Sequence, residues 1–345
     1  MLAKLKEYSA KNRYFVMLFG LMVLVLLFFT ITKGETLWTL GAWKGIFMQF
    51  PEYGVMTLGV MFCFIIGCID MSFVALGDFA CIIAVRYMAA NVTEDMSNGQ
   101  IGIVILKALL IVGVIAVVGG IINGALIAYL NIPPVMATIA MSLVWLGLST
   151  AITKGYAVTG VPELYTEIGH TMLFGFIPVP LLIFLVVFLF SMFLLKYTTY
   201  GKKLYMTGTN LKAAKFSAIN TKGMIIGTFI LCEVICALGC LIMVSTMNSA
   251  KADYGTSYVM RIILILVLAG VLPDGGLGKI FNVLLSIVAI QIIASGVNMF
   301  SQLNSYYASL IWGGLLIIVL ILSTKMNGGS WKLFNLRKGS IKNKS

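Results

Sequence analysis

Residue types that carry out catalysis are scarce in this chain. Among 345 residues there are 12 acidic residues and one histidine, and only 10% of all residues are charged. An active site needs several converging groups in defined roles, and His170 stands in an expected loop without a partner motif. The sequence therefore predicts that the protein is not an enzyme.

A nucleotide-binding loop is also missing. The run Asp274-Gly275-Gly276-Leu277-Gly278-Lys279 is rich in glycine. The phosphate-binding pattern G-x-x-x-x-G-K-[ST] would require a glycine where Pro273 stands and a serine or threonine where Ile280 stands. We therefore expect no ATP site and no cofactor in this chain.

The six cysteines show no established metal-binding pattern. Cys232, Cys236 and Cys240 recur at i, i+4 and i+8, so a thiolate site on one helix face, with Glu233 beside it, is one interpretation. Zinc normally takes four ligands brought together, and no histidine or further cysteine is near in sequence. Packing of small residues between helices is the favoured interpretation, and we expect no metal site.

Long apolar runs dominate what is present. Hydrophobic residues make up 60% of the chain, which is more than a soluble domain of this size can bury. A membrane-spanning helix needs about 20 apolar residues, and a backbone in lipid must satisfy its own hydrogen bonds. The sequence predicts an all-α polytopic bundle of about ten helices, at 14–32, 54–69, 71–90, 101–129, 132–152, 178–195, 223–243, 259–272, 280–299 and 306–324.

Basic residues predict the orientation of this bundle, because lysine and arginine are retained in cytoplasmic loops. With ten spans, 17 of the 24 basic residues fall on the side of the N-terminus. The acidic residues on the other side are Glu35, Glu52, Glu94, Asp95, Glu163, Glu167 and Asp253. We expect a cytoplasmic N-terminus (1–13), a transmembrane permease domain (14–324) and a cytoplasmic basic tail (325–345). The net charge of +12 indicates retention at a membrane surface rather than nucleic-acid binding. The first apolar run is long for a signal peptide, so an uncleaved helix is expected.

Polar residues within the apolar runs are candidates for a translocation path, because ionisable groups in lipid are costly. Asp70 and Ser72 lie in Gly67-Cys68-Ile69-Asp70-Met71-Ser72, a composition that favours an interrupted helix. Weaker path candidates are Asn123, Ser142 and Asn298; hydrogen bonding between helices is an equal alternative for the two asparagines. Asp78 and Glu233 are further ionisable residues, and for Glu233 a functional role and an ion pair are weighed equally.

One long hydrophilic loop, 196–222, interrupts the apolar chain and is predicted to contact a partner. Asn210 can cap a short helix over 211–219. That helix is expected to present small and aromatic residues flanked by lysines to a partner ATPase, with anionic lipid as the alternative occupant. The predicted coupling residues are Asn210, Lys212, Ala213, Ala214, Phe216 and Ser217. Elsewhere, Gly120 and Gly124 form a GxxxG pattern that predicts close helix packing.

Several segments together resemble one family. Residues 123–142, NGALIAYLNIPPVMATIAMS, are similar to the NG…IPPFIATLG stretch of permease subunits of ribose/galactose/xylose-type ABC importers. Gly67 to Ser72 resembles that family's GGIDLS segment, and residues 200–219 resemble its FGR…GGNEEAARLSGI loop. The resemblance runs in order from about residue 50 to 325. Leu211-Lys212 replaces the usual acidic pair, which implies a complementary change in the partner.

The resemblance implies a fold similar to permeases of the vitamin B12 class of importers. It implies that two permease chains, identical or related, surround a path in a bacterial cytoplasmic membrane. Cytosolic ATPases would bind the ATP, and an extracytoplasmic binding protein would deliver the solute. The expected solute is a monosaccharide of the ribose, galactose or xylose kind. Alternatives are a nucleoside importer of the same superfamily and, from another class, an ion-coupled secondary transporter using Asp70, Asp78 or Glu233.

Overall fold

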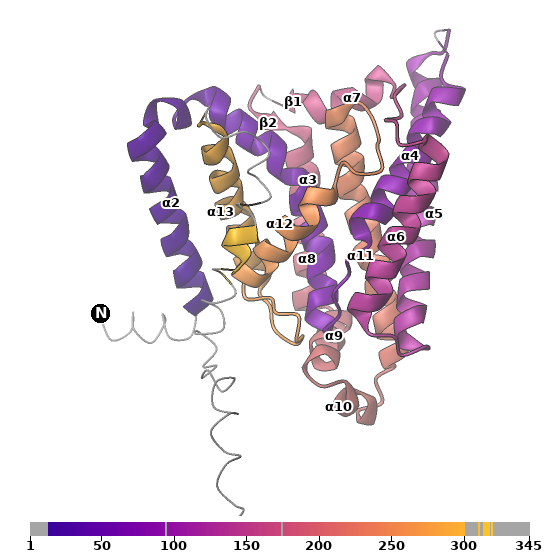
Figure 1. Ribbon diagram of the computed structural model, residues 1–345, viewed down its shortest axis with the longest axis vertical. Helices are drawn as coiled ribbons and strands as arrows, with labels where there is room; N and C mark the ends of the chain where they lie inside the picture. Colours follow the sequence, from indigo (N-terminus) through magenta and orange to yellow (C-terminus); the bar gives the residue numbers. More distant parts are fainter. Residues whose placement is uncertain are drawn as a thin grey trace, which may run out of the picture.

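The computed structural model describes residues 13–300 except 94 and 174, together with 310, 313–317 and 319. Most of this part is helical (Figure 1), which confirms the all-α prediction. The elements are α2 (Arg13–Leu37), α3 (Leu40–Ile66), α4 (Phe73–Asn91), α5 (Asn98–Ala128), α6 (Pro134–Thr153), α7 (Glu163–His170), β1 (Met172–Leu173), β2 (Ile177–Pro178), α8 (Val179–Tyr197), α9 (Thr199–Thr209), α10 (Leu211–Phe216), α11 (Thr221–Met247), α12 (Thr256–Leu268) and α13 (Ile280–Asn298).

Eight helices in the described residues are long and apolar enough to cross a membrane: α2, α3, α4, α5, α6, α8, α11 and α13. The predicted run 306–324 lies largely outside the described residues, as do the tails 1–12 and 325–345. Helix α6 begins at Pro134, directly after the Asn131 turn, because proline is favoured in a first helical turn.

The prediction for α3 was wrong at its start. The helix begins at Leu40 rather than near residue 54, and Thr39 caps it by accepting a hydrogen bond from the amide of Ala42 at 3.2 Å. Pro51 lies inside this helix, where its missing amide weakens the local sequence signal. Glu52 consequently lies in the span, 5% exposed, and not in an outer loop.

The predicted span 259–272 is also wrong as a full crossing. Helix α12 has 13 residues and ends at Leu268, and Gly270 follows with φ of 76°. The loop after it reaches the end of α3, where the amide of Gly276 donates to the carbonyl of Ile65 at 2.8 Å. A short helix followed by a loop therefore stands where a full spanning helix was predicted.

The loops lie at opposite ends of the bundle, in agreement with the distribution of basic residues along the chain. In Figure 1, α9 and α10 lie at the end where α2 begins, whereas α7, β1, β2 and the α4–α5 connection lie at the opposite end. Residues 196–222 and the start of α2 thus share one side of the bundle.

Helices α3 and α11 form the centre of the bundle. In the most apolar window of α3, 94% of the residues are buried, against 11% in α2. The predicted GxxxG packing is confirmed, because a Cβ on Gly120 or Gly124 would lie 2.6 Å from a Cα atom of α11. Close approach of α5 to α11 places the residue between those glycines, Asn123, against the bundle centre.

Candidate functional site

The helix break predicted at Gly67 to Ser72 separates α3 from α4. Gly67 ends α3 with φ of 85°, a conformation that side chains with a Cβ rarely adopt. Asp70 then holds the irregular backbone, because its Oδ1 accepts from both the amide and the hydroxyl of Ser72 at 2.8 Å. Both residues are fully buried, as irregular backbone at membrane depth requires.

Two other helices complete a buried polar cluster of Asp70, Ser72, Asn123 and Glu233. The side-chain amide of Asn123 donates to Ser72 Oγ at 2.7 Å and to Glu233 Oε1 at 3.0 Å, and Ser72 Oγ lies 3.3 Å from Glu233 Oε1. Asn123 and Glu233 are at most 1% exposed. The structure thus brings three predicted path residues together and adds Glu233, which composition alone placed only among ionisable residues of undecided role.

The other two path candidates lie elsewhere. Ser142 is half-buried on α6 and donates to the carbonyl of Ile139 in its own helix at 2.7 Å. Asn298 is exposed in the last turn of α13. Neither residue joins the polar cluster.

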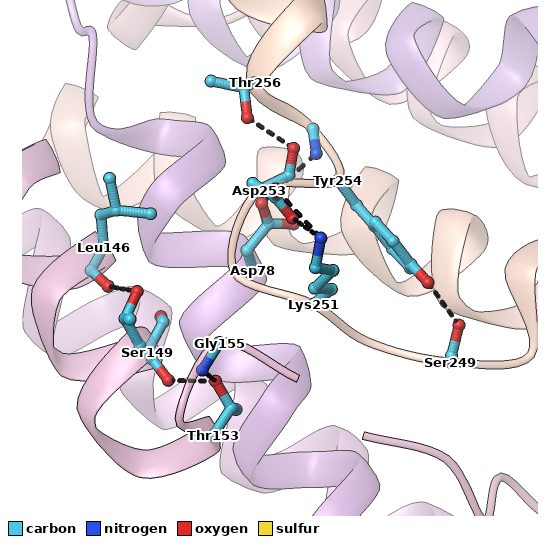
Figure 2. Close-up of polar contacts among 12 residues, drawn as sticks. Asp78, Leu146, Ser149, Thr153, Gly155, Ser249, Lys251, Asp253, Tyr254 and Thr256 are labelled. Atoms are coloured by element: carbon cyan, nitrogen blue, oxygen red, sulfur yellow. Dashed lines mark hydrogen bonds and ion pairs between the residues drawn. The ribbon is translucent and has the colours of Figure 1, made fainter. Parts of the chain in front are cut away.

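Asp78 accepts a hydrogen bond from the backbone just before α12. Its Oδ2 accepts from the amide of Gly255, at 3.4 Å, immediately before α12. Figure 2 shows Asp78 beside the loop in which Lys251 pairs with Asp253 at 3.0 Å and Tyr254 meets Ser249. This position fits an anchor for the start of α12.

A second buried network, missed by the sequence reading, ties α3 to α11, α12 and α13. Glu52 accepts from Thr246 at 2.6 Å and from Tyr258 at 2.8 Å. The Arg261 guanidinium lies 5.1 Å from the centre of the Tyr53 ring, and Tyr53 donates to Gln291. Glutamate and glutamine inside apolar runs were the available signals for this network.

The hydrophilic loop holds two short helices. Thr198 caps α9 through the amide of Gly201, and Asn210 caps α10 through the amide of Ala213 at 3.0 Å, as predicted for Asn210. Tyr205 anchors α9 by donating to the carbonyl of Gly278 at 2.7 Å. Burial raises the pKa of Tyr205 to about 12, so the phenol keeps its proton at neutral pH.

The predicted exposed surface of α10 needs one correction. Ala213, Lys212 and Ser217 are exposed and Phe216 is 92% exposed, but Ala214 is 2% exposed and points inward. Its amide and carbonyl still close the turn with Asn210 and Ile219. Ala214 therefore packs α10 against the rest of the protein and does not face a partner.

Glycines link this loop directly to the helix break. A Cβ on Gly208, near the end of α9, would lie 1.9 Å from the carbonyl of Ile65, and one on Gly275 would lie 2.8 Å from Gly67. We call Gly67, Gly208, Gly275 and Gly276 the glycine junction. Its backbones contact one another without side chains between them, so the end of α9 lies directly against the end of α3, close to Asp70 in the chain.

A cavity of about 600 Å³ opens beside the glycine junction. Its walls come from the end of α3, the α5–α6 turn and α9–α10, and include Gly67, Cys68, Asn131, Asn210 and Lys212. It connects the predicted coupling loop with the neighbourhood of the break.

Comparison with known proteins identifies the family. The model of the branched-chain amino acid transport system permease component matches residues 43–320. The LsrD autoinducer 2 import system permease protein of Photorhabdus laumondii is 28% identical over 275 residues, 78% of each chain. Its counterpart from Yersinia pseudotuberculosis is 29% identical over 230 residues, 64% of this chain and 68% of that protein.

No solved structure matches the chain significantly. The relatives are transport permeases, and the eight apolar helices fit a multi-pass protein of the bacterial inner membrane. The chain belongs to the family of branched-chain amino acid transport system permease components, as a permease of an ABC importer.

Proposed function

We propose that this permease imports a small polar solute of the monosaccharide type, with autoinducer 2 or a ribose-, galactose- or xylose-like sugar as the substrate class. The observation that carries this proposal is the similarity over 78% of the chain to permeases named for autoinducer 2 import. A nucleoside remains the alternative solute of the same superfamily, and the test below separates the two.

In the proposed mechanism, Asp70, Ser72 and Asn123 support the path by fixing the break between α3 and α4. Their mutual hydrogen bonds at 2.7–2.8 Å favour this role, because buried hydrogen bonds between side chains specify one local conformation. Ser142 and Asn298 lie apart from this cluster and would act at the surface of this chain.

The proposed coupling element is α10 with the end of α9. Asn210 fixes the start of α10, while Lys212, Ala213, Phe216 and Ser217 would contact a cytosolic ATPase and Ala214 would hold the helix in place. An exposed phenylalanine on a helix that projects from the bundle end supports a protein partner. The glycine junction would pass movement of α9 to the break. An extracytoplasmic binding protein and a second permease chain complete the proposed assembly.

Uptake in a reconstituted system tests the proposal. The permease, its ATPase and its binding protein would be placed in proteoliposomes and offered labelled autoinducer 2, ribose, galactose, xylose and a nucleoside. We expect ATP-dependent uptake of at least one of the sugar-type solutes. Uptake of the nucleoside alone would contradict the proposed class, and uptake driven by an ion gradient without ATP would assign the protein to secondary transporters.

A further inference from the structure

Cysteines from two helices meet the carboxylate of the helix break in the bundle centre. The donor atoms of Cys63 on α3, Asp70 in the break and Cys232 on α11 all lie within 4.8 Å of one another. Cys232 Sγ is 3.9 Å from Asp70 Oδ2, and all three residues are buried, as free thiols in the case of the cysteines. The sequence had suggested a different set, Cys232, Cys236 and Cys240 on one helix face.

The separations approach those of a metal-binding tetrahedron. With zinc–sulfur bonds of about 2.3 Å and zinc–oxygen bonds of about 2.1 Å, a tetrahedral site has sulfur–sulfur edges of about 3.8 Å and sulfur–oxygen edges of about 3.5 Å. The observed separations, all within 4.8 Å, exceed these edges by at most about 1.3 Å, which side-chain rotations can close. Three protein ligands from three separate segments would leave a fourth position for water.

Neighbouring residues hold the Asp70 carboxylate in a fixed orientation. Asp70 Oδ1 accepts two hydrogen bonds from Ser72, which orients the carboxylate and leaves Oδ2 facing Cys232. Among the described residues, the hydrogen-bond partners of Asp70 and Glu233 are Ser72, Asn123, Cys232 and each other, and none of these is a cation. Two carboxyl groups buried at one place need a positive charge or a proton to offset the cost of burial.

We propose that Cys63, Asp70 and Cys232 bind one thiophilic divalent cation of the zinc type. The ion joins α3 to α11 at the helix break, and its binding releases the two thiol protons. The cavity of about 600 Å³ on the α10 side is lined by Gly67 and Cys68, and Cys68 is two residues before Asp70 in the chain.

Metal content of the purified permease tests the site. Cells would be grown with added zinc, and the wild type, Cys63→Ser, Cys232→Ser and Cys240→Ser would be purified without chelator. Cys240 is the matched control, because it is a buried cysteine on α11 that packs against Gly77. We expect about one zinc ion per chain in the wild type and in Cys240→Ser, and at least a tenfold lower content in the other two variants.

A measurement on the wild type alone covers the case in which a variant fails to fold. Addition of Co²⁺ to chelator-treated wild-type protein should produce a thiolate-to-cobalt absorption band, and Zn²⁺ should abolish it. A wild type without zinc that also gives no cobalt band overturns the proposal and leaves a proton shared by Asp70 and Glu233 as the compensating charge. Equal metal loss in Cys240→Ser would also overturn it, because the metal would then not be bound at this site.

Discussion

At the scale of single residues, Asp70 has the strongest local role. It holds the interrupted backbone through Ser72 and contacts α11 through Cys232. An asparagine keeps one acceptor oxygen but places an amide where Oδ2 faces the α11 thiol. A hydrogen bond to a charged group contributes about 1.5–3 kcal/mol to stability. The change therefore disturbs the helix break and leaves the packing of the hydrophobic core intact.

We predict that Asp70→Asn lowers solute uptake at least tenfold, a factor that corresponds to about 1.4 kcal/mol, while the amount of permease in the membrane is unchanged. Uptake and quantitative immunoblotting measure the two quantities. Asp253→Asn is the control, because the Asp253 carboxylate pairs with Lys251 at the surface. Wild-type uptake by Asp70→Asn would remove Asp70 from the mechanism.

Gly208 tests the close contact between α9 and α3. Its hypothetical Cβ would lie 1.9 Å from a backbone carbonyl that cannot rotate away. We predict that Gly208→Ala lowers the free energy of unfolding by about 1–3 kcal/mol, the usual cost of overpacking. Thermal unfolding followed by tryptophan fluorescence in detergent measures the change.

The matched control is Gly227→Ala in α11, where nothing lies within 4 Å of the added Cβ. Alanine favours helix over glycine by about 0.8–1 kcal/mol, so this variant should be as stable as the wild type or more stable. If Gly208→Ala and Gly227→Ala unfold at the same temperature, the glycine junction is not a tight contact.

At the scale of elements, α10 has one side exposed and one side packed against the protein. Ala213 faces outward next to Ala214, which is buried. We predict that Ala213→Trp keeps the thermal stability of the wild type but uncouples ATP hydrolysis from uptake, whereas Ala214→Trp lowers stability. A cysteine at Phe216 should crosslink to the ATPase.

Lipid binding by α10 would give a different pattern. In that case Lys212→Gln with Lys215→Gln would weaken association with anionic vesicles, and Ala213→Trp would leave coupling unchanged. Normal coupling in Ala213→Trp, together with no crosslink from Phe216→Cys, would show that α10 is not the coupling element.

At the scale of the whole molecule, the two ends of the bundle carry different loops. Asn98 begins α5 at one end and Lys212 lies in α10 at the other, and both are exposed. The native cysteines are all buried, so single cysteines can be introduced without removing them. We predict that Asn98→Cys reacts with an impermeant thiol reagent from outside the cell and that Lys212→Cys reacts only after the membrane is opened. Reaction of both from the same side would contradict the arrangement in Figure 1.

Local sequence signals were enough for the elements and for parts of the site. The apolar runs predicted most spanning helices, Asn210 predicted its own cap, and the composition of Gly67 to Ser72 predicted the break. Each of these depends on hydrogen bonds or hydrophobicity within a few consecutive residues. Sequence therefore determined an all-α membrane protein with an interrupted helix and a hydrophilic loop on the side of the N-terminus.

Tertiary packing decided the features that depend on residues far apart in the chain. Glu233 joins Asp70 and Asn123 only because Gly120 and Gly124 let α5 approach α11 closely. Ala214 is buried although its neighbours are exposed, because the surface against which a short helix packs decides which of its sides is buried. The position of the loop after α12 likewise depends on the end of α3, where the amide of Gly276 donates to the carbonyl of Ile65. Periodicity and composition contain no information on such contacts, because they are properties of one segment and the contacts join two.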